Sequence, residues 1–252
     1  MESTITYGKN AVIEALQSAT RDFNKILIAS NLHPDSKIEQ IKKLASEKNI
    51  VFQFVAREKL NALAPDVQHQ GVIAQISPVK YTDLDDFIEK NKDKNTSVMI
   101  LDGVEDSHNI GAIIRSCVCA GVSGIILPAR RGVLINSTVE KTSAGAINHI
   151  DVIKTNSLVN TIQRLKENNY WVIASDHHSN DYYYDVDYTN MSFAIIMGAE
   201  HSGISKSLLK LSDWKVKIPM LTNFNSLNVS NAAAIILFEA VKQIHKNKII
   251  NP

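Results

Sequence analysis

The sequence predicts two α/β domains, the second of which contains a parallel sheet. Short apolar runs alternate with amphipathic segments along the 252 residues, which is typical of α/β proteins. Residues 97–127 contain an apolar strand, a polar loop, a helix and a second strand, the repeating unit of a parallel sheet. A charged stretch with weak periodicity, 78–95, precedes this unit. We therefore place a first domain at 1–77, a linker at 78–95 and a second domain at 96–252.

The first domain is expected to be a small α/β unit of its own. Apolar residues at helical spacing predict helices over 7–18 and 58–64, and a third helix that begins at Ser36. Short apolar runs between turn residues predict three strands, at 26–29, 51–55 and 71–76.

The second domain is expected to be doubly wound, with strands and helices in alternation. One helix is expected to be capped by Asn109 and to end at Gly121. The small apolar run after Asn228 predicts a well-packed final helix. The tyrosine-rich stretch 176–190 is expected to be irregular. The strands are expected at 97–101, 125–127, 150–153, 170–174, 193–197 and 216–219, and further helices at 84–88, 141–146 and 158–167.

Composition and charge exclude several classes of protein. A net charge of +1 gives no chain-wide signal for nucleic-acid binding, so an RNA site would have to be a local patch. The sequence shows no N-terminal signal peptide and no apolar run long enough for a membrane span. Cys117 and Cys119 lie two residues apart in a helical pattern and cannot pair there, which suits a reducing cytosol. We therefore expect a cytoplasmic protein without a membrane partner.

Several familiar cofactor and catalytic loops are absent from the sequence. The second domain has no G-x-G-x-x-G after its first strand and no P-loop, which disfavours dinucleotides and ATP bound in the usual manner. No G-x-S-x-G turn is present, which disfavours a serine hydrolase. His177, His178 and His201 are not at metal-ligand spacing, so we interpret them as surface or loop histidines and expect no metal.

The unusual polar residues of the second domain gather after two strands and at the start of two helices. Helix capping could explain Asn109, Ser226 or Asn228 singly, but it does not require the whole set. Arg115 lies in an otherwise apolar helix, where its planar guanidinium could pair with a carboxylate or bind phosphate. Loops at strand ends bind the ligand in open α/β sheets. The set consists of Asn109, Arg115, Glu200, Asn223, Asn225, Ser226, Asn228 and Ser230.

Three segments of the second domain resemble the motifs of the SpoU branch of the SPOUT methyltransferases. They are NIGAIIR from Asn109, MGAEHSG from Met197, and IPM from Ile218 together with SLNVS from Ser226. The resemblance covers residues 97–246 and includes the motifs in order. In the first domain, YGKNAV and HQGVIA resemble the ends of the ribosomal-protein-L30e-like RNA-binding domain of this family. The sequence departs from the family pattern at His201, Asn225 and Asn231.

The resemblance implies an RNA ribose 2′-O-methyltransferase that uses S-adenosylmethionine. It also implies a deep trefoil knot in the second domain, and a homodimer in which both chains contribute to each site. With the L30e-like domain present, the resemblance is greatest to enzymes that methylate a guanosine ribose in large-subunit (23S) ribosomal RNA. The expected partners are therefore this RNA and a second copy of the chain.

The resemblance assigns roles to residues as well. In the family, the arginine of the first motif is proposed to help remove the proton of the 2′-hydroxyl. Because arginine stays protonated below about pH 12, we interpret Arg115 as a fork on the substrate phosphate that stabilises a developing alkoxide. The implied catalytic residues are Asn109, Arg115, Glu200, Ser226 and Asn228, and the implied adenine-binding backbone groups are those of Gly198, Ile218 and Leu227.

Three other functions stay open at this point. The first is the same reaction on transfer RNA, which the separate first domain disfavours. The second is a non-catalytic RNA-binding or ribosome-assembly factor of the same fold, which the presence of Asn109, Arg115, Glu200 and Asn228 disfavours. The third is a methylation of ribosomal RNA that confers antibiotic resistance.

Overall fold

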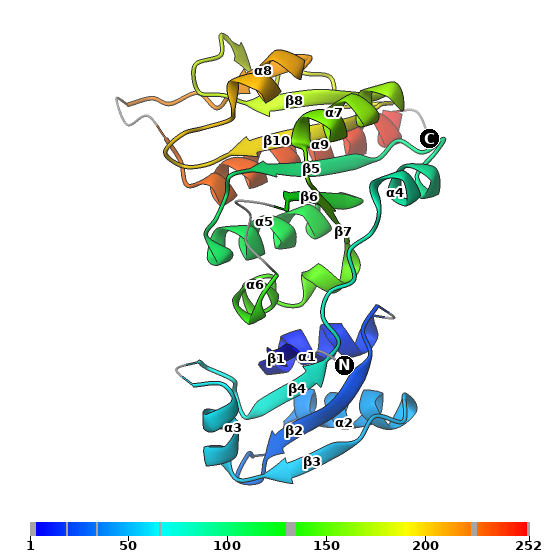
Figure 1. Cartoon of the computed structure of the whole chain (residues 1–252), viewed down its shortest axis with the longest axis vertical. Coiled ribbons are helices and arrows are strands. Elements are labelled where there is room, and N and C mark those ends of the chain that lie inside the picture. The colour runs from blue at the N-terminus through cyan, green and yellow to red at the C-terminus, as the bar shows by residue number, and fades with distance from the viewer. Residues whose placement is uncertain are drawn as a thin grey trace. The chain divides into compact units, whose positions relative to one another are not determined.

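The chain forms two compact units (Figure 1). The computed structural model describes residues 4–18, 20–33, 35–65, 67–129, 135–222 and 226–250, without the side chains of 247–250. The first unit comprises Met1–Lys80 and Ile135–His149, and the second comprises Tyr81–Leu134 and Ile150–Pro252. Segment 135–149, predicted to lie in the second domain, packs with the first unit.

A four-stranded mixed sheet forms the centre of the first unit, in the order β1-β4-β2-β3. Strand β4 is antiparallel to β1 and β2, and β2 is parallel to β3. Apolar residues of α1 and α2 pack with Ile26 and Ile28, while Leu60 of α3 packs with Leu27 in a separate cluster. The elements are β1 (Thr4–Tyr7), α1 (Lys9–Gln17), β2 (Phe23–Ala29), α2 (Ser36–Glu47), β3 (Phe52–Val55), α3 (Arg57–Leu63) and β4 (Val72–Ile76).

The segment 135–149 is attached to the first unit by buried polar contacts. It contains α6 (Ser137–Thr142) and the short 3₁₀ helix η1 (Ala146–His149). Arg21 forms an ion pair with Glu140, and the two side chains are only 1% and 3% exposed. Arg21 Nε also donates to Asn148 Oδ1 at 3.0 Å. Burial raises the pKa of Glu140, and the charge of Arg21 opposes this effect.

A seven-stranded parallel sheet forms the centre of the second unit, in the order β7-β6-β5-β10-β8-β11-β9. The strands are β5 (Ser97–Asp102), β6 (Gly124–Pro128), β7 (Asp151–Thr155), β8 (Tyr170–Ser175), β9 (Asp181–Tyr182), β10 (Ser192–Gly198) and β11 (Trp214–Lys217). The helices are α4 (Leu84–Lys90), α5 (Ser107–Cys119), α7 (Leu158–Glu167), α8 (Lys206–Leu211) and α9 (Val229–Ile250). The predicted α/β class with a parallel sheet is confirmed.

Helices cover both faces of this sheet (Figure 1). Phe87 of α4, Leu165 of α7 and Leu208 of α8 share one apolar cluster with Ile100 and Ile196 of the central strands. Helices α5 and α9 pack against each other, and α9 also contacts β10. Because α4 lies within the predicted linker 78–95, this part of the linker belongs to the second unit.

The strand order creates a switch point at the centre of the sheet. From β5 the chain adds β6 and then β7 on one side, whereas β10 pairs with β5 on its other side. Gly198, at the end of β10, is in register with Asp102, at the end of β5. The loops after these two strands therefore start side by side, which is where open α/β sheets bind their ligands.

The local predictions differ from the structure in several places. Asp106, and not Asn109, caps α5, because its Oδ1 accepts from the backbone N–H of Asn109 at 2.7 Å. The stretch 176–190 contains the short strand β9, and Ser179 and Tyr183 tie it to β11 by hydrogen bonds. Strand β1 and helix α8 had no predicted counterpart.

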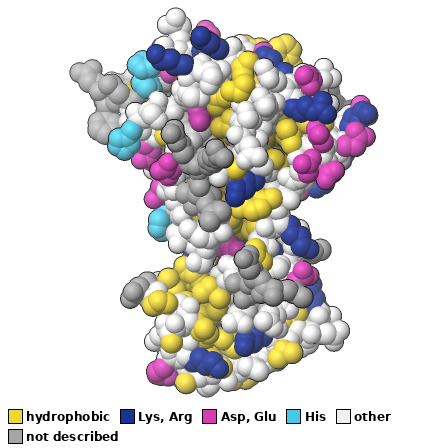
Figure 2. Space-filling model, in the orientation of Figure 1, with side chains coloured by type: hydrophobic (Ala, Val, Ile, Leu, Met, Phe, Trp, Pro, Cys, Tyr) yellow, Lys and Arg dark blue, Asp and Glu magenta, His cyan; other side chains and the backbone are white. Residues whose placement is uncertain are grey.

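The net charge of +1 gives no marked excess of basic side chains over the chain as a whole. On the face of the second unit drawn in Figure 2, basic and acidic side chains are interspersed. No helix within the described residues is long and apolar enough to cross a membrane. The expectation that an RNA site is a local patch stays a prediction.

Candidate active site

Three of the predicted site residues form a hydrogen-bonded triangle at the switch point. Asn109 Nδ2 donates to Glu200 Oε1 at 2.8 Å. Asn228 Nδ2 donates to Asn109 Oδ1 at 2.8 Å and to Glu200 Oε1 at 3.2 Å. The triangle joins α5, the loop after β10 and the start of α9, which lie far apart in the sequence. Each side chain is therefore oriented by the other two.

The loop after β10 positions Glu200 by a tight turn. Ala199 and Gly203 exchange backbone hydrogen bonds of 3.2 and 2.9 Å across this turn. Gly198 packs so closely on the returning chain that an added Cβ would lie 2.3 Å from the carbonyl carbon of Gly203. A side chain at position 198 would therefore displace the turn that carries Glu200.

Asn228 is held by the helix that follows it. Its Oδ1 accepts from the backbone N–H of Ser230 at 2.9 Å and from the Ser230 hydroxyl at 2.6 Å. A side-chain oxygen that satisfies an N–H of the first turn acts as a helix cap. Asn228 thus has two roles in the structure: its oxygen caps α9 and its Nδ2 holds the triangle.

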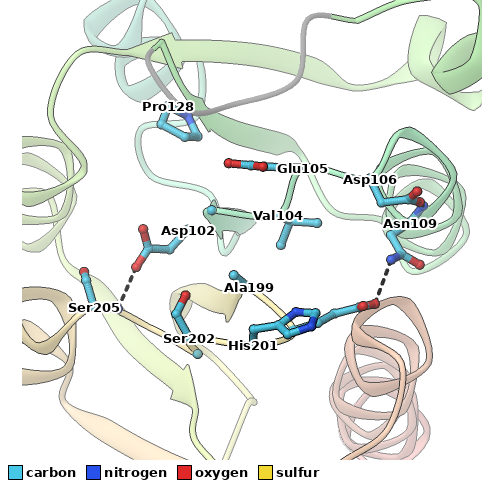
Figure 3. Close-up of a pocket in the computed structure, with 13 residues that line it drawn as sticks. Asp102, Val104, Glu105, Asp106, Asn109, Pro128, Ala199, His201, Ser202 and Ser205 are labelled. Atoms are coloured by element: carbon cyan, nitrogen blue, oxygen red, sulfur yellow. Dashed lines mark hydrogen bonds between the residues drawn. The ribbon is translucent and has the colours of Figure 1, made fainter.

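Two cavities of about 630 Å³ each adjoin the triangle and share part of their walls. The first lies between the loops after β5 and β10 and includes Asn109 and Glu200 in its wall (Figure 3). The second lies between the loops after β10 and β11 and the start of α9. The residues common to both linings are Ala199, Glu200, His201 and Gly203.

The second cavity brings together the predicted adenine-binding residues. Gly198, Ile218 and Leu227 all line it, and so does Ser226. Ser226 forms no hydrogen bond with any residue that the structure describes, and it is not part of the triangle. Asn223 and Asn225, singled out from the sequence, lie outside the described residues.

Arg115 is not brought to the triangle within one chain. It follows Asn109 on α5 at a spacing that places the two residues on different sides of the helix. It is exposed and lines neither cavity. Within the described ranges of the chain, its guanidinium has no hydrogen-bond or ion-pair partner.

The structure adds residues that sequence reasoning missed. His201, interpreted as a loop histidine, lines both cavities. His177, Tyr182 and Lys217 line the second cavity, and Lys217 Nζ lies 5.3 Å from the centre of the Tyr182 ring. The tyrosine-rich composition of 176–190 was the available signal, but the pairing of β9 with β11 was not predicted. In the described part of the chain, no group of three or more His, Cys, Asp or Glu residues could hold a metal ion.

The second unit matches a known family of methylases. Residues 96–238 match the model of the SpoU rRNA Methylase family. The chain belongs to the SpoU methylase family. Residues 5–82 match the model for RNA 2′-O ribose methyltransferase substrate binding, which covers most of the first unit. As a SpoU methylase, the chain is an S-adenosylmethionine-dependent RNA 2′-O-methyltransferase.

Relatives of this SpoU methylase match along the full chain. A protein of Staphylococcus saprophyticus assigned to the TrmH family of tRNA/rRNA methyltransferases is 40% identical over 245 residues, 96% of this chain and 97% of its own. An AdoMet-bound rRNA methyltransferase from Sinorhizobium meliloti has a TM-score of 0.80 at 22% identity, covering 95% of this chain and 87% of its own. The SpoU methyltransferase AviRb from Streptomyces viridochromogenes has a TM-score of 0.82 at 22% identity, covering 97% of this chain and 91% of its own. The two structural likenesses support the fold.

The second cavity fits the cofactor of the family. Its volume of about 630 Å³ is within the usual range for small-molecule sites. Met197, Ile218 and Leu227 would offer apolar surface to a flat adenine, and Ser226 and Lys217 would offer polar groups to the ribose and the amino-acid end. S-adenosylmethionine, when bound, supplies a methyl group on a positively charged sulfur.

Proposed function

We propose that the chain methylates the 2′-hydroxyl of a guanosine in large-subunit (23S) ribosomal RNA, in the cytoplasm and as a homodimer. The observation that supports this most is that Glu200 lines both cavities and is held there by hydrogen bonds from Asn109 and Asn228. One cavity fits the cofactor, so the other is available for the acceptor nucleotide. Glu200, in the shared wall, would then lie beside both the cofactor and the acceptor ribose.

The roles of the side chains follow from what each can donate or accept. One oxygen of Glu200 accepts hydrogen bonds from both asparagines, and its second oxygen can accept a hydrogen bond from a ribose hydroxyl. Ser226 can donate to or accept from the ribose or the cofactor. These contacts align the 2′-oxygen with the methyl group, and alignment of reacting atoms supplies much of the rate. A 2′-hydroxyl also has to lose its proton during attack.

Arg115 is proposed to act across the dimer interface. It has no partner within the described residues and lines neither cavity, whereas a guanidinium is suited to a phosphate or carboxylate. In a dimer in which both chains contribute to each site, Arg115 of one chain would bind the substrate phosphate at the site of the other. The developing alkoxide is stabilised there by positive charge, and its proton passes to phosphate or water.

The surface near the second cavity supports the homodimer. Glu200 and Asn228 are exposed in the single chain, although reacting groups work best when water is excluded. Leu227 in the cavity wall, Leu221 in the neighbouring loop and Phe238 further along α9 are large apolar side chains with exposures of 38%, 101% and 47%. A second copy packed on this surface would cover these apolar side chains as well as Glu200 and Asn228. We also propose that the passage of α9 past the loop after β10 forms the trefoil knot of the family.

The test is methyl transfer from labelled S-adenosylmethionine to ribosomal and transfer RNA purified from cells that lack this gene. The modified position is mapped by the resistance of a 2′-O-methylated linkage to alkaline cleavage. One resistant guanosine in large-subunit RNA is expected. A resistant position only in transfer RNA would contradict the substrate while preserving the chemistry. Cofactor binding without transfer to either RNA would point to an assembled particle as substrate, and no binding would favour a non-catalytic factor.

Transfer RNA remains the second candidate substrate. The Staphylococcus saprophyticus relative is assigned to a family of tRNA/rRNA methyltransferases, so its name covers both substrates. The separate first unit supports ribosomal RNA, because it provides a substrate-binding domain in addition to the catalytic one.

A further inference from the structure

The first cavity has an acidic wall next to the triangle. Asp102, Glu105, Asp106 and Glu200 all line it, and no described residue of its lining is Lys or Arg. The carboxylates of the described lining would repel an RNA phosphate, since like charges in a partly enclosed site raise the energy of binding. A neutral nucleobase with N–H donors is the part of a nucleotide that such a wall accepts.

Three of the four carboxylates already have hydrogen-bond donors. Asp102 Oδ2 accepts from the backbone N–H of Ser205 at 2.7 Å, and Asp106 caps α5. Glu200 accepts from the two asparagines of the triangle. Glu105 differs from these three, because its carboxylate has no hydrogen-bond or ion-pair partner among the described residues. Among the described lining residues it is the carboxylate with both oxygens available to a ligand.

The backbone after β5 presents Glu105 to the cavity. Gly103 has a φ of +75°, so the chain turns sharply at the end of the strand. Val104 is then buried, with 5% exposure, while Glu105 is exposed. Figure 3 shows the Glu105 side chain extending into the cavity, with Asp102 and Ser205 on one side of the view and Asp106 and Asn109 on the other.

We propose that Glu105 determines base specificity by accepting two hydrogen bonds from the Watson–Crick edge of guanine in this cavity. Guanine carries N1–H and the 2-amino group side by side, and the two oxygens of a carboxylate can accept from both. Adenine and cytosine each present one amino group beside a ring acceptor, and uracil presents one N–H between two carbonyls. A carboxylate repels these acceptors, so Glu105 favours guanine over the other three bases.

This inference rests on the proposed function, because it assumes that the first cavity holds the acceptor nucleotide. The methyl-transfer site lies at the shared wall, so a base in the first cavity keeps its ribose near the triangle. Glu105 would then contact the base only, whereas Glu200 would contact the ribose. Glu105 is therefore expected to affect the preference among bases, whereas Glu200 is expected to affect the rate of methyl transfer to any base.

The experiment uses the mapped RNA segment synthesised with guanosine, inosine or adenosine at the target position. Inosine keeps N1–H but lacks the 2-amino group, so one of the two hydrogen bonds is lost. The wild-type enzyme is expected to show a kcat/KM about tenfold lower for inosine and lower still for adenosine, as a bidentate base contact predicts. In Glu105→Ala the guanosine-to-inosine ratio is expected to fall to about one.

A matched variant controls for unspecific effects of removing a carboxylate. Glu89→Ala removes an exposed carboxylate on α4 that lines neither cavity, and its guanosine-to-inosine ratio is expected to match the wild type. Loss of activity in Glu105→Ala with an unchanged ratio would overturn the inference, because a merely structural role has that result. A mapped target other than guanosine would also overturn it while leaving the methyltransferase activity established. No methyl transfer to any RNA would contradict the proposed function together with the inference.

Discussion

Asn109 Nδ2 lies 2.8 Å from Glu200 Oε1, which joins the first turn of α5 to the loop after β10. The contact exists because β5 and β10 are neighbours in the sheet and end in register. Asn228, at the start of α9, donates a further hydrogen bond to Asn109 and so completes the triangle. Three segments that have no local reason to meet are thus held in one geometry.

Removal of one side chain of the triangle is expected to impair the other two. Asn109→Ala should lower kcat about 10²-fold, because a small misplacement of reacting groups has an effect of that size. Asn109→Ala/Glu200→Ala should lose far less than the product of the two single losses, since the side chains act as a unit. Steady-state kinetics of the three variants tests this, and independent, multiplicative losses would contradict the arrangement.

Arg115 provides a test of the phosphate fork and of the dimer. Arg115→Lys keeps the charge but loses the planar fork, so kcat/KM should fall at least about tenfold. Near-normal turnover of this variant would rule out the fork. Arg115→Ala and Glu200→Ala should each lose most of their activity. A randomly reassembled equimolar mixture of the two should regain up to about a quarter of wild-type activity, because about half of its dimers are mixed and one of the two sites in each mixed dimer is intact. No recovery in verified mixed dimers would place both residues in the same chain's site.

Phe238 provides a test of the dimer surface itself. It is 47% exposed on α9, so a lysine there should fold normally but disfavour apolar packing of a second chain. Phe238→Lys is expected to shift the molar mass measured by light scattering from two chains to one and to reduce methyl transfer. Lys246→Glu, which changes a charge further along α9, provides a comparison. A monomeric wild-type protein would refute the dimer directly.

His69 is expected to make the stability of the first unit depend on pH. Its Nδ1 accepts from the backbone N–H of Gly71 at 3.0 Å, which leaves Nε2 to donate to Asn61 Oδ1 at 2.8 Å. Burial, followed by the charges of Arg57 and Lys141, lowers the pKa of this histidine. The folded state therefore binds the proton less readily than the unfolded state, and stability should fall as the pH decreases below the ordinary histidine value of about 6.5. Urea unfolding of wild type and His69→Gln from pH 5 to pH 7.5, in about half-unit steps, should show a weaker pH dependence in the variant.

Breaking the buried ion pair Arg21–Glu140 should lower the free energy of unfolding strongly, whereas replacing both residues by apolar ones should change it little. Glu140→Leu leaves the guanidinium of Arg21 buried without its partner, which is expected to destabilise the first unit by about 3–5 kcal/mol. Arg21→Met/Glu140→Leu removes both charges and should recover most of that loss. Urea unfolding measures both changes. A double variant as unstable as the single one would show that the pair itself, and not the unpaired charge, maintains the packing.

Local patterns predicted most elements of the sheet but not the contacts between distant segments. The apolar runs of β5, β6, β8 and β10 are buried on both faces, so their composition is distinctive. Strand β1 was missed because TITY is short and half polar, and its pairing with β4 lies outside its own sequence. Asn109 was taken as a cap because asparagine commonly is one, whereas Asp106, three positions earlier, occupies that role.

The candidate site was predictable where short motifs carried it. Asn109, Glu200 and Asn228 were singled out from their positions after strands and before helices, and the register of β5 and β10 then brings them together. The position of Arg115 was not predictable, because it depends on which side of α5 the sheet covers. Glu105 was part of a recognised polar loop, but only the hydrogen bonds of its neighbours distinguish it from them.

The packing of 135–149 with the first unit affects how this protein could exchange parts with its relatives. A fragment ending at Lys80 would lack α6 and would expose Arg21 without Glu140, so it is not a self-sufficient module. A chimaera that takes its RNA-binding portion from another family member would need two separate stretches of gene from the same parent. Recombination at a single junction would mismatch this buried pair, which favours joint inheritance of the two portions.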